Sequence, residues 1–141
     1  MPGSYSQLFY HFIWTTKNRA PTMTPELREA LFRYIRMKCQ QHRAVVYGLG
    51  GIEDHVHLLV SLPPNLSPSK FAADIKGAAS HFVNDEILKS KAFYWQEGYG
   101  VVSLAKKDLK QVAEYIDNQE EHHHENRLWP SMETSGSDQV K

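Results

Sequence analysis

Two histidines separated by a single residue lie in the stretch D-H-V-H-L-L-V-S, which begins at Asp54. The aliphatic residues that follow them are typical of a buried strand. Because side chains alternate along a strand, His55 and His57 should point to one face and Val56 to the other. Neutral imidazole is a good ligand for divalent transition metals, so this pair could bind one metal ion. Two ligands leave the site incomplete, and a catalytic metal needs a third protein ligand and open positions.

An H-x-H pair has other interpretations. The two histidines could simply be polar residues on the exposed face of a half-buried strand. The histidine-triad nucleotide hydrolases alternate three histidines, but the third place here is Leu59. The two-histidine phosphoesterases follow each histidine with Ser or Thr two places on, whereas here His57 and Leu59 occupy those places. The sequence therefore excludes the last two families.

The segment V-A-E-Y-I-D-N-Q-E-E-H-H-H could supply the missing groups. Tyr115 and Gln119 are four residues apart, so they stack on one face of a helix, and His122 continues the row. A tyrosine can attack phosphorus, and a glutamine carbonyl oxygen can bind a hard cation. Taken alone, Tyr115 could be an amphipathic residue at a helix border. The segment from Gln119 to His124 could equally be a solvated helix end.

The remaining sequence predicts the elements that position these residues. Two helices begin with a capping residue followed by proline, at Thr24-Pro25 and Ser67-Pro68. Aromatic, β-branched and glycine-bounded runs predict strands, and helical spacing of apolar residues predicts helices. The predicted strands are 10–16, 44–52, 55–62 and 101–104, and the predicted helices are 24–42, 67–88 and 108–123.

This order predicts an α+β fold of the ferredoxin-like, split βαβ type, with an antiparallel sheet and an extra C-terminal helix that carries Tyr115. The second and third strands should form a hairpin, with turn residues at Gly50-Gly51 and Glu53-Asp54. One face of the sheet should be covered by helices.

Length and composition set further bounds. The 141 residues suit one domain, which we place at 1–130, followed by a flexible polar tail at 131–141. The net charge of zero argues against a strongly cationic protein that coats nucleic acid, although a local basic groove remains compatible with it. The single cysteine, Cys39, excludes an intramolecular disulfide and suits the cytoplasm. The N-terminus resembles neither a signal peptide nor a membrane span.

Three segments in this order carry a family resemblance: H-F-I-W-T-T-K-N-R, G-G-I-E-D-H-V-H-L-L-V and V-A-E-Y-I-D-N-Q-E-E-H-H. With the residues between them they cover about Tyr5 to Trp129. The chain resembles the single-tyrosine HUH transposases of small bacterial insertion sequences, which include the REP-associated tyrosine transposases. In the HUH motif, U is a hydrophobic residue, here Val56.

The resemblance implies a DNA transposase that cleaves and rejoins single-stranded DNA. His55, His57 and Gln119 would bind a divalent metal, Mg²⁺ or Mn²⁺, and Tyr115 would form a 5′-phosphotyrosine and release a 3′-hydroxyl. No ATP is required, and the sequence contains no P-loop or dinucleotide motif. The implied partners are hairpin-containing single-stranded DNA and a second copy in a homodimer. A hinge at Ser103–Asp108 could place the tyrosine helix on its own or the neighbouring subunit.

Basic and aromatic residues are candidates for DNA contacts. Each basic residue could equally be a solvated charge, and each aromatic residue could pack in the core. The basic candidates are Lys17, Arg19, Lys70, Lys76, Lys106 and Lys107, with Lys110 close by, and the aromatic ones are Tyr94, Trp95 and Tyr99.

Three other functions stay open at the level of sequence. The chain could be a domesticated relative that acts on genomic repeat hairpins, with the same catalytic residues. It could be a nucleic-acid-binding module without catalysis, although the intact residues His55, His57, Tyr115 and Gln119 argue against this. A structural metal protein should be richer in Cys or His ligands. His122 to His124 could add adventitious metal binding.

Overall fold

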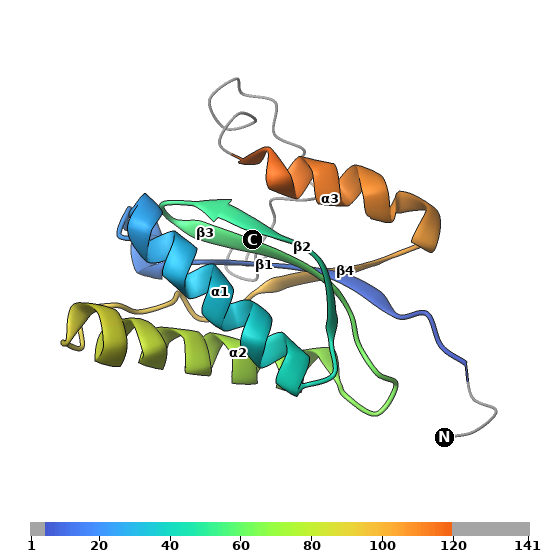
Figure 1. Ribbon diagram of the computed structural model, residues 1–141, viewed down its shortest axis with the longest axis horizontal. Helices are drawn as coiled ribbons and strands as arrows, with labels where there is room; N and C mark the ends of the chain where they lie inside the picture. Colours follow the sequence, from blue (N-terminus) through green and yellow to red (C-terminus); the bar gives the residue numbers. More distant parts are fainter. Residues whose placement is uncertain (1–4, 120–141) are drawn as a thin grey trace.

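The computed structural model describes residues 5–119, which form a four-stranded antiparallel sheet with helices on both faces (Figure 1). The strand order is β2-β3-β1-β4. This arrangement confirms the α+β, ferredoxin-like fold predicted from the sequence. The strands are β1 (Phe9–Thr15), β2 (Val45–Ile52), β3 (His55–Ser61) and β4 (Gly100–Leu104).

The two long helices begin where the sequence predicts. Thr24 caps α1 (Pro25–Gln41) by accepting a hydrogen bond from the Leu27 backbone N–H. Ser67 caps α2 (Pro68–Phe82) in the same way. The chain stays helical to Leu88 as expected, but the segment Val83–Leu88 winds as a π-helix, a form that the sequence did not predict.

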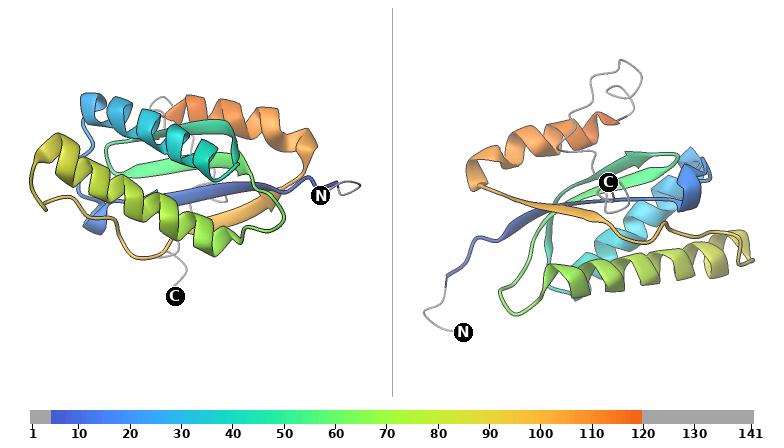
Figure 2. Two further views of the ribbon diagram at one scale, coloured as in Figure 1. Left: turned by 60° about the horizontal axis from the view of Figure 1, so that its bottom comes forward. Right: turned by 180° about the vertical axis from the view of Figure 1, so that it is seen from behind.

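The helices divide between the two faces of the sheet. α1 and α2 cover one face, and α3 (Leu109–Asp117) lies across the other (Figure 2). The main core forms between α1, α2 and the sheet, and contains Val56, Leu58 and Val60. A second, smaller core joins Leu59 of the opposite face to α3. Alternation along β3 therefore sends its odd-numbered residues, including both histidines, toward the face that α3 covers.

β2 and β3 form the predicted hairpin, and its turn lies at Glu53 and Asp54. Gly50 and Gly51 belong to the strand rather than to the turn. A Cβ atom at Gly50 would lie 2.6 Å from the backbone oxygen of Ile116 in α3. Gly50 therefore allows α3 to approach the sheet closely, and this packing explains the glycine better than a turn does.

The last helix begins close to the expected residue. α3 starts at Leu109, next to the predicted Asp108, and is regular to Asp117. Asn118 interrupts it, with its side chain donating a hydrogen bond to the Glu114 carbonyl, and Gln119 is again helical. The predicted end near His123 lies outside the described residues. His122 to His124 and the tail predicted at 131–141 lie outside the described residues, so those predictions stay untested.

Candidate active site beneath the last helix

The two histidines of the H-x-H motif lie side by side on β3. His55 and His57 are 1% and 0% exposed, and their ring centroids are 5.1 Å apart. Both face the side of the sheet that α3 covers, so they are not polar residues on a wet surface. Burial of two imidazoles requires polar partners for their ring nitrogens, because an unpaired buried polar group is costly.

The last helix brings the predicted tyrosine and glutamine to these histidines. The Tyr115 ring lies edge-on to His57, with centroids 6.0 Å apart. The side-chain oxygen Oε1 of Gln119 lies 3.0 Å from Nε2 of His55. Tyr115 and Gln119 are themselves 1% and 2% exposed. One chain therefore assembles all four residues singled out in the sequence, although their roles stay predictions.

The contacts of His55 limit where its proton can be. Its Nδ1 lies 2.8 Å from the Asp54 carboxylate, which can only accept, so Nδ1–H is the donor. The Gln119 amide nitrogen lies 3.4 Å from the Tyr115 carbonyl, which turns the amide oxygen toward His55. With Nδ1–H donating to Asp54, Nε2 of the neutral His55 ring carries the lone pair and faces Gln119 Oε1. These two atoms are therefore suitably placed to contact one cation.

His11 is a member of this site that the sequence analysis quoted in a motif but gave no role. It lies on β1, and its Nε2 is 2.8 Å from Nδ1 of His57. The strand register pairs His11 with Leu59, so His11 and His57 are diagonal neighbours on adjacent strands. His11 and His57 are close because β1 pairs with β3, and the local sequence pattern does not predict which strands pair. Asp54 was missed for a simpler reason, since it reads as a turn residue.

The basic residues proposed for DNA contacts do not lie in one patch. Lys17 and Arg19 follow the end of β1 at which Thr15 pairs with His55, so they lie at the His55 end of the sheet. Lys106 and Lys107 follow β4 at the opposite end, where Leu104 pairs with Phe9 of β1. Lys70 and Lys76 lie on α2, across the sheet from α3.

Lys76 is held within the chain. Its ammonium donates hydrogen bonds to the carbonyls of Gln96 and Gly98, at 2.9 and 2.6 Å. Burial lowers the pKa of Lys76, against a smaller opposing effect of Glu97. These contacts tie α2 to the segment that leads into β4 and give Lys76 a structural role.

The aromatic candidates fall into two groups. The indole N–H of Trp95 donates to the Lys76 carbonyl, and its ring packs edge-on against Trp14. Tyr99 is half-buried against the main core. Tyr94 is 57% exposed, and the Lys17 ammonium lies 5.8 Å from its ring centroid. Of the three, Tyr94 is the one with a ring face open to a ligand.

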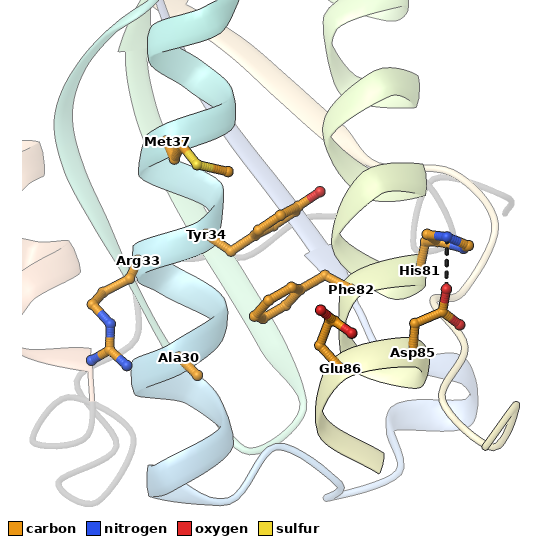
Figure 3. Close-up of a pocket in the computed structure, with 8 residues that line it drawn as sticks. All are labelled: Ala30, Arg33, Tyr34, Met37, His81, Phe82, Asp85 and Glu86. Carbon is orange, nitrogen blue, oxygen red and sulfur yellow. Dashed lines mark ion pairs between the residues drawn. The ribbon is translucent and has the colours of Figure 1, made fainter. Parts of the chain in front are cut away.

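A pocket of about 730 Å³ lies away from this site, between α1 and the end of α2 with the π-helical segment that follows it (Figure 3). The Tyr34 and Phe82 rings stack there at 4.2 Å. His81, unassigned from its sequence, lines the pocket and pairs with Asp85 at 2.8 Å on an exposed helix surface. The pocket contains none of the predicted catalytic residues, so its size does not make it the reaction site.

Other features of the described residues narrow the chemistry. Cys39 is fully buried in the main core, and burial raises the pKa of its thiol to about 12. The thiol is therefore not an activated nucleophile. Within residues 5–119, no cluster of three or more His, Cys, Asp or Glu side chains could hold a metal ion. Among the described residues, the Gln119 amide oxygen is the donor that lies beside His55. No helix in this same range is long and apolar enough to cross a membrane.

Proteins of similar sequence are known, and they identify the family of this chain. The model of the family described as "Transposase IS200 like" matches residues 4–119, which include every residue of the site. The chain belongs to the IS200-like transposase family. It is 30% identical over 122 residues to the ISDra2 transposase TnpA of Deinococcus radiodurans, covering 83% of this chain and 87% of that protein. It is 28% identical over 115 residues to the IS200 transposase of Salmonella typhimurium, covering 78% and 75%.

Solved structures show the same fold for this transposase. A crystal structure of a protein assigned as a transposase in Deinococcus radiodurans R1 matches with a TM-score of 0.68 and 26% identity, covering 84% of this chain and 95% of that one. A REP-associated tyrosine transposase bound to a REP hairpin matches with a TM-score of 0.63 and 16% identity, covering 92% and 79%. At that identity the second match concerns the fold alone.

Proposed function

We propose that this transposase cleaves and rejoins single-stranded DNA through a covalent 5′-phosphotyrosine at Tyr115. In this proposal His55, His57 and Gln119 hold a divalent metal ion, Mg²⁺ or Mn²⁺. The observation that carries the proposal is the convergence of His55, His57, Tyr115 and Gln119 beneath α3, with His55 Nε2 and Gln119 Oε1 3.0 Å apart.

The donor set fits such an ion. His55 Nε2 and Gln119 Oε1 lie 3.0 Å apart, so both atoms could contact one ion. Imidazole nitrogen with amide oxygen suits Mn²⁺, and the oxygen also suits Mg²⁺. When bound, the ion would polarise the scissile phosphate and balance its developing charge.

The chain's own residues would do the rest of the chemistry. The Tyr115 oxygen forms a bond to phosphorus while the bond from phosphorus to the 3′ oxygen breaks. The phenol gives up one proton and the departing 3′ oxygen gains one, so the step is balanced in charge. A 3′-hydroxyl that attacks the phosphotyrosine reverses these bonds and joins a new strand. One phosphodiester replaces another, so no nucleotide cofactor is consumed.

Tyr115 is 1% exposed with α3 in the position described. In this proposal, a shift of α3 away from the sheet gives a phosphate access to the Tyr115 oxygen. The connection between β4 and the turn Lys106–Asp108 is the single residue Ala105, so such a shift would be a rotation about a short link. This supports the predicted hinge at Ser103–Asp108.

The DNA is expected to be a hairpin-containing single strand, as in the REP-associated transposase that was solved with its hairpin. Exposed Lys17 and Arg19, with Tyr94 beside Lys17, are the contacts we favour, because they lie at the His55 end of the sheet. Lysine and arginine position the phosphate backbone, and an exposed aromatic ring can stack on an unpaired base.

Covalent capture tests the chemistry directly. A hairpin DNA from the flanks of the transposase gene is labelled at its 3′ end, because a 5′-phosphotyrosine retains the downstream fragment. Wild type is expected to give a labelled protein band on a denaturing gel with Mn²⁺ and none with a chelator. Tyr115→Phe should give no band, while Tyr34→Phe, a matched change on α1, should behave as wild type. A band that persists in Tyr115→Phe would overturn the assignment.

The homodimer implied by the resemblance stays a prediction, and a mixing experiment addresses it. His57→Ala and Tyr115→Phe are each inactive in this proposal. If the site forms within one chain, as the contacts of Tyr115 favour, the mixture stays inactive. If the helix serves a partner subunit, a mixed dimer regains one complete site and cleavage returns. Light scattering of the same samples gives the oligomeric state.

A further inference from the structure

The histidine that sequence analysis left without a role makes a close contact with a proposed metal ligand. His11 Nε2 and His57 Nδ1 are 2.8 Å apart, which is a hydrogen-bond distance. The two side chains are 3% and 0% exposed. Their rings also overlap, with centroids 5.0 Å apart and planes inclined by 29°. The orientation of His57 is therefore fixed from the neighbouring strand.

The direction of this hydrogen bond decides whether His57 can bind a metal through Nε2. A neutral imidazole carries one proton, on either Nδ1 or Nε2. If His57 donates from Nδ1 to His11, its Nε2 keeps the lone pair that a metal requires. If His57 accepts at Nδ1, its proton is on Nε2 and that nitrogen cannot be a ligand.

We propose that His11 is a positioning residue that accepts the hydrogen bond from His57 Nδ1–H and so keeps His57 Nε2 available for the metal. The proposal rests on the proposed function, because it concerns the same metal site. Metal-binding histidines commonly donate their second ring N–H to a neighbouring acceptor, and the loss of that acceptor weakens binding.

Asp54 shows the same arrangement on the other histidine. It accepts from His55 Nδ1–H at 2.8 Å, so each of the two proposed ligands has its Nδ1 in contact with a separate buried or half-buried partner. The partners differ in kind, since one is a carboxylate and the other a second imidazole. His11 comes from β1 and Asp54 from the hairpin turn, so two distant parts of the chain orient the pair.

The test compares two substitutions of His11 in the full-length, untagged protein. His11→Phe keeps a ring of similar size and removes the acceptor, whereas His11→Gln places an amide that can accept at a similar reach. We expect His11→Phe to raise the Mn²⁺ dissociation constant by about 10–100-fold, and His11→Gln to recover most of the affinity. His42→Phe is the matched control, because His42 is hydrogen-bonded to Lys38 and Asp74 elsewhere. It should leave Mn²⁺ affinity unchanged.

An NMR measurement on the metal-free wild type determines the tautomer of His57 without any substitution. Long-range ¹H–¹⁵N correlation spectra of the histidine rings distinguish the two tautomers. The expected result is a proton on Nδ1 of His57 and none on Nε2. A proton on Nε2 would overturn the proposal, and this reading holds even if His11→Phe fails to fold.

The outcomes separate this inference from the proposed function. If His55→Ala and His57→Ala abolish the specific Mn²⁺ site while His11→Phe binds as wild type, the role of His11 is wrong and the metal site stands. If His55→Ala and His57→Ala bind Mn²⁺ as wild type does, the proposed metal site itself is wrong. Loss of affinity in His11→Phe with recovery in His11→Gln supports both.

Discussion

His55 on β3 and Gln119 just after α3 lie 64 residues apart in the chain, yet their Nε2 and Oε1 atoms are 3.0 Å apart. Asp54 holds the His55 ring from the other side, so this nitrogen is fixed in direction. The glutamine thus joins the last helix to the histidine strand through one polar contact.

Gln119→Leu should raise the Mn²⁺ dissociation constant at least about tenfold, because it removes a proposed ligand. Loss of a residue that only supports a ligand already lowers metal affinity about 10–100-fold. Gln119→Glu keeps an oxygen donor and should retain binding. Gln111→Leu, an exposed glutamine on the same helix, is the control. Calorimetric titration gives the constants, and equal affinity of Gln119→Leu and wild type would remove Gln119 from the site.

Gly50→Ala should displace α3, because its Cβ would lie 2.6 Å from the Ile116 backbone oxygen. We expect a loss of about 1–3 kcal/mol in the free energy of unfolding, together with loss of DNA cleavage, since Tyr115 is next to Ile116. Gly48→Ala faces the same helix, but its Cβ would meet atoms at 3.5 Å, an ordinary contact distance. Denaturant unfolding and covalent capture compare the two, and equal behaviour would show that α3 has more freedom than its packing indicates.

Lys17→Met should weaken DNA binding, whereas Lys76→Met should lower the stability of the fold. Lys17 is exposed, so its loss should weaken DNA binding at all sequences and reduce the slope of log affinity against log salt by about one. Lys76 donates to two carbonyls, so its loss should lower the free energy of unfolding by about 1–3 kcal/mol. Lys70→Met carries the same change of charge on α2 and serves as control. An unchanged salt slope in Lys17→Met would place the DNA elsewhere.

Asp74 gives a prediction for acid stability. The hydrogen bond from His42, with a smaller contribution from Lys70, holds the pKa of Asp74 below its usual value of 3.8. A depressed carboxyl pKa stabilises the fold above that usual value, and the contribution is lost as pH falls through the lower, folded-state pKa. Asp74→Asn should therefore lose less stability than wild type when pH is lowered below about 4. Thermal unfolding across pH 2–6 tests this, and parallel curves would contradict it.

Hydrogen exchange should distinguish the two cores. α3 is attached through the small cluster around Leu59, Val112 and Ile116, whereas β1 and β3 are buried between both layers. We expect the amides of α3 to exchange well before those of the central strands, because local opening follows the extent of local burial. Mn²⁺ should slow exchange in α3 of wild type and have no effect in Gln119→Leu. Equal protection of α3 and β3 would mean that the helix opens only on global unfolding.

The sequence predicted the elements and their order well because local signals mark them. Caps at Thr24 and Ser67, and alternation through His55 to Ser61, are properties of neighbouring residues. The features it missed depend on contacts between distant segments. His11 meets His57 only because β1 pairs with β3, and Gly50 meets Ile116 only because α3 folds back over β2. The predicted end of the last helix near His123 stays a prediction, because the described residues stop at Gln119.

The position of α3 at the C-terminal end of the described chain determines when its residues are synthesised. α3 follows β4, so all four strands, with His11, His55 and His57, leave the ribosome before Tyr115 and Gln119 do. Tyr115 and Gln119 are thus the last residues of the described site to be made, and a nascent chain released before α3 carries the histidines without the proposed nucleophile.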